Sequence, residues 1–233
     1  MKDAIPKEAT LHFVSVIGSR AKGLSGAQSD YDIRAIMSFP KNMYLLQTQP
    51  EQRKINTHID GVEVEGTAID LLQALNYSVA TNPFMYDLLY GIVLLQDEVS
   101  DGVRKIFNES FDSNKIRKAA AGHVLSSLPK KGGKVNDMKL VEGKSSKNKI
   151  ACEAAYLATR VRYINLNPNE IPPFDVFKLI EKAFAPEEEQ TKNMVLKLVN
   201  DRIVNKNGQF EVTAEFINFL NESLNKDLIP NIE

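Results

Sequence analysis

The sequence contains a single cysteine, Cys152, and only three histidines, His12, His58 and His123, which are scattered along the chain. One cysteine cannot form an internal disulfide, and no Cys/His spacing typical of a zinc site is present. No local motif supplies partners for a Ser-His-Asp site, so we expect the histidines to be structural or surface residues. These absences exclude a disulfide-stapled domain and a zinc finger.

Long apolar runs and an excess of charge of one sign are also missing. No run approaches the roughly 20 apolar residues that a membrane-spanning helix needs, and the charged first residues lack the apolar core of a signal peptide. We therefore expect a soluble, cytoplasmic protein without a membrane partner. The chain has 29 Lys and Arg against 30 Asp and Glu, which argues against a polyanion-binding surface overall but leaves a local basic patch open.

The first hundred residues mix strand and helix signals. At 233 residues and 43% hydrophobic content, the chain can fold as one large or two small domains. Short apolar or alternating runs predict strands over 11–17, 30–38 and 61–69. Between the first two strands, the Gly- and Ser-rich residues 18–29 predict a loop. Asp70 and Asn82-Pro83 are typical of helix starts.

The second half has helical patterns and no clear strand after about residue 100. The helices are expected over roughly 113–128, 149–165, 174–184, 191–204 and 213–225. We therefore predict an α+β domain over residues 1–105, followed by a helical domain over 106–233. Within the latter, residues 130–149 hold seven lysines against two acidic residues. This segment is interpreted as a solvated loop, with a grip on an RNA backbone as the alternative.

A candidate phosphate and metal site lies where the first strand ends and the second begins. Gly18-Ser19 closes the first strand, and such small residues let the backbone approach a ligand and offer amides and a hydroxyl to phosphate. Asp30 and Asp32 lie two residues apart at the next strand, so their side chains share a face. Two adjacent carboxylates repel each other unless a cation neutralises them, and oxygen ligands suit Mg²⁺ with substrate phosphates.

Charged residues around this motif extend the candidate site. Arg20, Lys22 and Arg34 are close in sequence and are expected to meet the remaining phosphate charge. A site for two metal ions usually needs a third acid. The third strand offers Glu63 and Glu65 on one face, with Asp70 just beyond, and spacing alone does not choose among the three.

The two halves of this motif, residues 18–23 (Gly-Ser-Arg-Ala-Lys-Gly) and 29–34 (Ser-Asp-Tyr-Asp-Ile-Arg), resemble the DNA-polymerase-β-like nucleotidyltransferase superfamily. Within it they look like the predicted nucleotidyltransferases called RlaP or YcgL-like, which are associated with RNA repair in bacteria and large phages. The segment that starts at Asn82-Pro83, with Asp87 and Leu89, is similar to the family's Asn-Pro-x-x-x-acid-x-Leu.

The resemblance implies a polymerase-β-like mixed sheet flanked by helices. It favours Glu65, where the family usually has Asp, as the third acid, and Asp70 as a helix cap. In a later helix, Ala155, Tyr156 and Arg160 fit a family stretch that Glu153 and Leu157 do not. Arg160 is the expected nucleotide contact there, with a solvated arginine on the helix surface as the alternative.

The implied activity is metal-dependent transfer of a nucleoside monophosphate from an NTP to an acceptor hydroxyl, with RNA among the acceptors and pyrophosphate released. Asp30, Asp32 and Glu65 would be the catalytic residues and the ligands of Mg²⁺ or Mn²⁺. Gly18 and Ser19 would hold the phosphates. Two other hypotheses stay open: a catalytically silent nucleotide- or RNA-binding module that acts through a protein partner, and a helical interaction protein with an incidental motif.

Overall fold

The computed structural model describes residues 6–26, 29–45, 53–59, 62–127, 147–205 and 213–224. The chain divides into two compact units. The chain up to Asp112, apart from Leu24–Gly26, forms an α+β unit, and Leu24–Gly26 cluster with Ser113 and the residues after it in a helical unit. The boundary expected after residue 105 would fall inside helix α5 (Glu98–Glu109).

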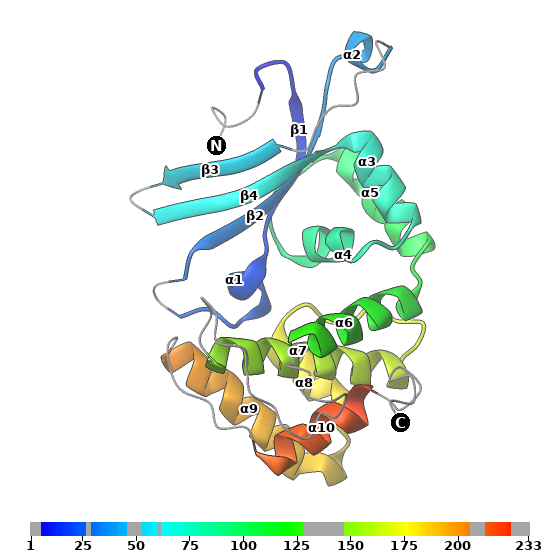
Figure 1. The fold of residues 1–233 in the computed structure, drawn as a ribbon. Coiled ribbons are helices and arrows are strands. Elements are labelled where there is room, and N and C mark those ends of the chain that lie inside the picture. The colour runs from blue at the N-terminus through cyan, green and yellow to red at the C-terminus, as the bar shows by residue number, and fades with distance from the viewer. Residues whose placement is uncertain are drawn as a thin grey trace. The chain divides into compact units, whose positions relative to one another are not determined.

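The α+β unit is built on a mixed sheet with the strand order β3-β4-β2-β1-β5 (Figure 1). Its strands are β1 (Thr10–Val16), β2 (Tyr31–Ser38), β3 (Arg53–Ile59), β4 (Val62–Asp70) and β5 (Ile92–Gln96). The pair β2 and β4 is parallel, whereas β1–β2, β1–β5 and β3–β4 are antiparallel. This arrangement confirms the expected mixed sheet flanked by helices.

The two faces of the sheet differ because side chains alternate along each strand. One face carries an apolar cluster that includes Val14, Ile33, Ala35 and Ile55. The other face holds α3 (Leu71–Val79) over β2 and β4, and α4 (Pro83–Tyr90) and α5 next to β1. Figure 1 shows these three helices on one side of the sheet.

Side-chain caps fix where α3 and α4 begin. The Leu72 amide donates to Asp70 Oδ1 at 2.8 Å, and the Phe84 amide donates to Asn82 Oδ1 at 2.9 Å. Each acceptor satisfies an amide that has no partner inside the helix. Pro83 occupies the first turn of α4, where a missing N–H does no harm. Both predicted helix starts are confirmed.

Several elements of the α+β unit differ from the sequence prediction. The predicted loop begins with a short helix, α1 (Gly18–Lys22), which ends at Gly23 with a φ of 77°. Strands β3 and β5 and helices α2 (Lys41–Leu45) and α5 were not predicted. β3 is a polar edge strand that is stabilised by its pairing with β4. Because that stabilisation comes from another segment, the residues of β3 by themselves give only a weak strand pattern.

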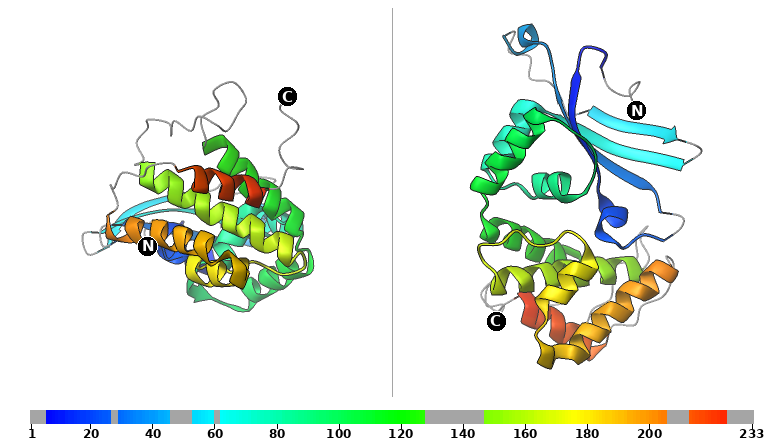
Figure 2. Two further views of the ribbon diagram at one scale, coloured as in Figure 1. Left: turned by 90° about the horizontal axis from the view of Figure 1, so that it is seen from below. Right: turned by 180° about the vertical axis from the view of Figure 1, so that it is seen from behind.

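The helical unit consists of α6 (Ser113–Ser127), α7 (Lys147–Leu166), α8 (Val176–Ala183), η2 (Pro186–Glu188), α9 (Glu189–Val204) and α10 (Ala214–Leu224). α7 packs against α6, α8, α9 and α10 (Figure 2). Cys152 lies buried in the core that these helices form. The predicted helices of this half are confirmed. The lysine-rich segment lies outside the described residues, apart from 147–149 at the start of α7.

Within the described residues, no helix combines the length and the apolar character that crossing a bilayer requires.

A buried histidine joins three distant parts of the α+β unit. His12 is 7% exposed. Its Nδ1 lies 2.7 Å from Asp97 Oδ2, and its Nε2 lies 2.7 Å from Ser38 Oγ. These two contacts tie β1, which carries His12, to the end of β2 at Ser38 and to the start of α5 at Asp97. The cluster is therefore structural, as expected for His12.

Asp97 has two structural roles, because it also caps α5 by accepting from the Ser100 amide at 3.0 Å. Asp97→Ala removes both contacts and should lower the free energy of unfolding by about 1–2 kcal/mol, whereas Asp97→Asn keeps the cap and should lose less. Urea denaturation measures the difference. The exposed change Lys105→Ala in the same helix is the control, expected within about 0.5 kcal/mol of the unaltered protein. An Asp97→Ala variant as stable as this control would contradict the assigned roles.

Candidate functional site

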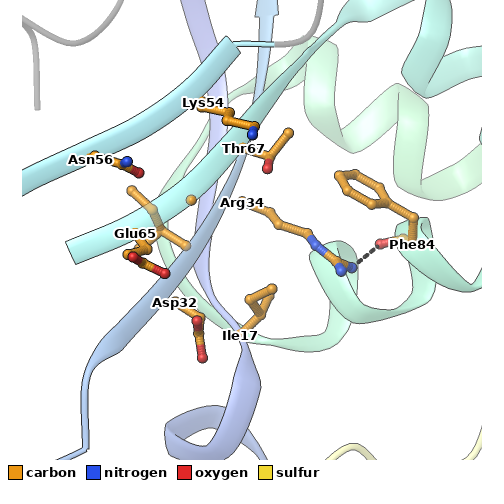
Figure 3. Close-up of a pocket in the computed structure, with 10 residues that line it drawn as sticks. Ile17, Asp32, Arg34, Lys54, Asn56, Glu65, Thr67 and Phe84 are labelled. Carbon is orange, nitrogen blue, oxygen red and sulfur yellow. Dashed lines mark hydrogen bonds between the residues drawn. The ribbon is translucent and has the colours of Figure 1, made fainter. Parts of the chain in front are cut away.

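A pocket of about 400 Å³ opens on the face of the sheet that carries α4 (Figure 3). It is formed by β2, β3 and β4, by the residue after β1 and by the start of α4. The lining residues are Ile17, Asp32, Ile33, Arg34, Lys54, Asn56, Glu65, Gly66, Thr67 and Phe84. Two of the predicted catalytic residues, Asp32 and Glu65, are among them.

The parallel register of β2 and β4 pairs Asp32 directly with Glu65. Paired residues of neighbouring strands lie side by side on one face, and Figure 3 shows the two side chains on the same side of the sheet. Glycine at position 66 allows this close pairing. A Cβ there would lie 2.4 Å from both Ile33 Cγ1 and the Ile33 carbonyl oxygen.

Gly18 lies against the Asp32 carboxylate. Its φ is 65°, a left-handed conformation that side chains disfavour, and a Cβ there would lie 2.0 Å from Asp32 Oδ2. The Ile17 amide donates to the Asp32 carbonyl at 2.8 Å, which fixes the end of β1 beside the start of β2. The predicted Gly-Ser turn and the second aspartate of Asp-x-Asp are therefore in direct proximity, and Ser19 follows in α1.

Arg34 forms the wall of the pocket next to α4. Its Nη1 donates to the Phe84 carbonyl at 2.9 Å and to Asp87 Oδ2 at 3.3 Å. The guanidinium also lies 4.0 Å from the centre of the Phe84 ring, a cation–π contact. Burial lowers the pKa of Arg34, and the nearby carboxylates of Asp87 and Asp32 oppose that shift. The guanidinium is thus held in place at the edge of the two-carboxylate site.

Comparison with known proteins assigns the family. The model of the RlaP family, described as the RNA repair pathway DNA polymerase beta family, matches residues 4–228. The chain belongs to the RlaP family. The match spans both units, so the expectation drawn from the Gly-Ser and Asp-x-Asp motif is confirmed at the level of family and fold.

Among solved structures, the chain is similar to a nucleotidyltransferase-like protein from Exiguobacterium sibiricum. The identity is 10% and the TM-score 0.33, over 98% of this chain and 71% of that chain. A comparison with curated proteins finds no match.

In this RlaP-family chain, Arg20 and Asp30 lie outside the residues that line the pocket. Arg20 Nε donates to the carbonyls of Ser29 at 3.1 Å and Asp30 at 3.2 Å, and its guanidinium lies 3.9 Å from the centre of the Tyr31 ring. Arg20 therefore orders the backbone that leads into β2. Asp30 is exposed just before this strand, and Lys22 ends α1 outside the lining.

The described residues contain no group of three His, Cys, Asp or Glu side chains that could hold a metal ion. Asp30, Asp32 and Glu65 therefore do not form a three-acid group here. The pocket itself offers two carboxylates, Asp32 and Glu65. Mg²⁺ is commonly bound by one or two carboxylates together with substrate phosphates and water. The donor set fits a Mg²⁺ ion that is shared with a nucleotide.

The other candidate acids on β4 lie away from the pocket. Asp70 is 2% exposed, and its carboxylate accepts from the Leu72 amide and, at 2.5 Å, from the Tyr44 hydroxyl. Burial, followed by the hydrogen bond to Asp70, raises the pKa of Tyr44 to about 12. Asp70 is thus a cap, as the resemblance favoured. Glu63 is exposed and does not line the pocket.

Arg160 belongs to the helical unit. It is 4% exposed, and its Nη2 donates to the Tyr156 hydroxyl at 2.5 Å. That hydroxyl in turn donates to the Phe174 carbonyl at 2.9 Å. The guanidinium also lies over the Tyr156 ring, 4.7 Å from its centre. These contacts give Arg160 a structural place in the unit, and its contact with a nucleotide stays a prediction.

Of the residues that line the pocket, the sequence analysis singled out only Asp32, Arg34 and Glu65 as site residues. The side chains that it missed include those of Lys54, Asn56, Thr67 and Phe84. The sequence pattern that could have predicted β3 is the alternation of polar and apolar residues, in which Ile55 is buried between the exposed residues Lys54 and Asn56. Phe84 lies at the third position of the Asn-Pro segment, and only the position of α4 brings it to the pocket.

The contact between Gly18 and Asp32 generates a prediction. Gly18→Ala should destabilise the protein more than Gly23→Ala. Both changes place a side chain at positive φ, which costs about 1–2 kcal/mol, and a Cβ on Gly18 would in addition lie 2.0 Å from Asp32 Oδ2. Thermal or urea unfolding measures both variants.

A double-mutant cycle isolates the clash. In an Asp32→Ala background, Gly18→Ala should cost less than in the unaltered protein, because the colliding carboxylate is gone. An equal cost in the two backgrounds would show that Asp32 does not constrain Gly18.

Proposed function

We propose that the protein is a metal-dependent nucleotidyltransferase that transfers a nucleoside monophosphate from an NTP to an acceptor hydroxyl. The observation that carries the proposal is the pairing of Asp32 with Glu65 in one pocket, with Gly18 against the Asp32 carboxylate. Two paired carboxylates beside a glycine turn suit the binding of a cation and a phosphate chain together. The family description supports RNA as the acceptor class.

Each residue has a separate task in this proposal. Asp32 and Glu65 hold Mg²⁺ or Mn²⁺ with the phosphates of the nucleotide, and Asp30 adds negative charge at the exposed rim. Gly18 and Ser19 approach the β- and γ-phosphates through their amides and the Ser19 hydroxyl. When bound, the metal ion neutralises the triphosphate and lowers the pKa of the attacking hydroxyl.

The reaction exchanges one phosphorus–oxygen bond for another. The acceptor oxygen forms a bond to the α-phosphorus, and the bond from that phosphorus to the bridging oxygen of the β-phosphate breaks. Pyrophosphate leaves with the electron pair, and the hydroxyl proton passes to water. Most of the rate enhancement then comes from positioning and charge neutralisation, as for phosphoryl transfer generally.

The test is transfer of label from α-³²P-NTPs to RNA, protein and small acceptors. Asp32→Asn and Glu65→Gln should each lower the transfer rate by about a thousandfold, because each removes several kcal/mol of charge stabilisation. Asp70→Asn keeps the α3 cap and lies outside the pocket, so it should transfer at the rate of the unaltered protein. Equal rates for Glu65→Gln and Asp70→Asn would contradict the role of Glu65.

A second candidate, a silent nucleotide- or RNA-binding module acting through a protein partner, is favoured by one observation: no three-acid group forms within the described part of the chain. The same variants separate the two functions. If Mg²⁺-NTP stabilises the unaltered protein against heat but no acceptor is labelled, and Asp32→Asn keeps the biological activity, binding is the function.

A further inference from the structure

The polar side chains of the pocket divide into an engaged and an unengaged set. Arg34 is fixed by Phe84 and Asp87 on the side of α4. On the opposite side, Lys54, Asn56 and Thr67 make no side-chain hydrogen bond or ion pair with any other described residue. Lys54 and Asn56 are also exposed. An ammonium, an amide and a hydroxyl that the fold does not use are available to a ligand.

The register of β3 on β4 places this unengaged set around Glu65. Asn56 pairs with Glu65, and Lys54 pairs with Thr67, two positions further along β4. All four side chains project on the pocket face, and Figure 3 shows Lys54 next to Thr67. A ligand bound to these groups therefore lies beside the Glu65 carboxylate.

The strand order places the glycine turn and Lys54 on opposite sides of the two carboxylates. Gly18 follows β1, whereas Lys54 lies on β3, and β2 and β4 lie between them. Three strand spacings amount to about 14 Å. A triphosphate held at Gly18 and Ser19 has its leaving group at the β1 side of the two carboxylates. In-line displacement requires the attacking and leaving oxygens on opposite sides of the phosphorus, so the acceptor enters from the side of β3.

We propose that Lys54, Asn56 and Thr67 form an acceptor subsite that binds a phosphate group carried by the acceptor near its attacking hydroxyl. The inference rests on the proposed function and adds the chemical class of the acceptor. Lys54 supplies a positive charge, while the Asn56 amide and the Thr67 hydroxyl supply hydrogen-bond donors. Glu65 repels an anion, so a phosphate at this place depends on the Lys54 charge.

The experiment measures two affinities separately. Fluorescence anisotropy gives the Kd of a labelled 12-nucleotide oligoribonucleotide with a free 3′-hydroxyl, in Mg²⁺ without NTP, and calorimetry gives the Kd of Mg²⁺-ATP and the other Mg²⁺-NTPs. Lys54→Ala should weaken the oligonucleotide about tenfold, the effect of one charge-assisted hydrogen bond, and change NTP affinity less than twofold. Lys54→Arg should restore most of the oligonucleotide affinity. Lys41→Ala, an exposed lysine of α2 outside the pocket, is the charge-matched control and should leave both affinities unchanged.

Competition identifies the source of the phosphate. A nucleoside monophosphate that displaces the oligonucleotide, where the matching nucleoside does not, shows that a small phosphate ester is sufficient. Displacement only by a second oligonucleotide shows that the polymer is required. Either result supports the subsite if Lys54→Ala weakens the binding of the probe that displaces the oligonucleotide.

Three results would overturn the inference: equal weakening of NTP and oligonucleotide by Lys54→Ala, no weakening beyond that of Lys41→Ala, or no saturable binding of either phosphate probe to the unaltered protein. These outcomes differ from failure of the proposed function. If labelled transfer occurs and depends on Asp32 but not on Lys54, only the acceptor subsite is wrong. If no transfer occurs in any reaction, the proposed function fails whatever Lys54 binds.

Discussion

The parallel pairing of β2 with β4 is the constraint on which the candidate site depends. It brings together two acidic residues that are 33 positions apart in the chain, Asp32 and Glu65. Because side chains alternate along a strand, a register shift of one residue would move Glu65 to the apolar face and replace it with Gly66 or Val64. Gly66 protects against that shift, since only glycine fits against Ile33 at this point.

Electrostatic repulsion between the two carboxylates is balanced by their surroundings rather than removed by burial. Glu65 is exposed and Asp32 is half-buried, so water screens both. The positive charge of Arg34 lies nearby, held by Asp87 and by the Phe84 carbonyl and ring. The Asn82 cap and Pro83 fix the start of α4 and thereby the position of Phe84. A local helix signal thus determines one wall of a site formed by distant strands.

The polar groups of this sheet fall into two sets, those that bond within the fold and those that line the pocket. His12, Ser38, Asp97 and Asp70 are joined to partners within the α+β unit, and their hydrogen bonds fix the ends of strands and helices. On the pocket face, Lys54, Asn56 and Thr67 have no such partners among the described residues. Polar groups that folding leaves unused beside paired carboxylates are where ligand recognition is expected.

The sequence by itself determined the features that local chemistry specifies. The β-branched run before Gly18 identified a strand, Asp70 and Asn82 identified helix starts, and the Gly-Ser and Asp-x-Asp motifs carried the resemblance to the family. Tertiary structure decided the rest. Whether Glu63, Glu65 or Asp70 joins Asp32 depends on strand register, which is set by hydrogen bonds between segments far apart in the chain. Likewise, Lys54 and Asn56 belong to the pocket only because β3 pairs with β4. The seven residues of β3 are mostly polar, so their own sequence hardly indicates that they form an edge strand.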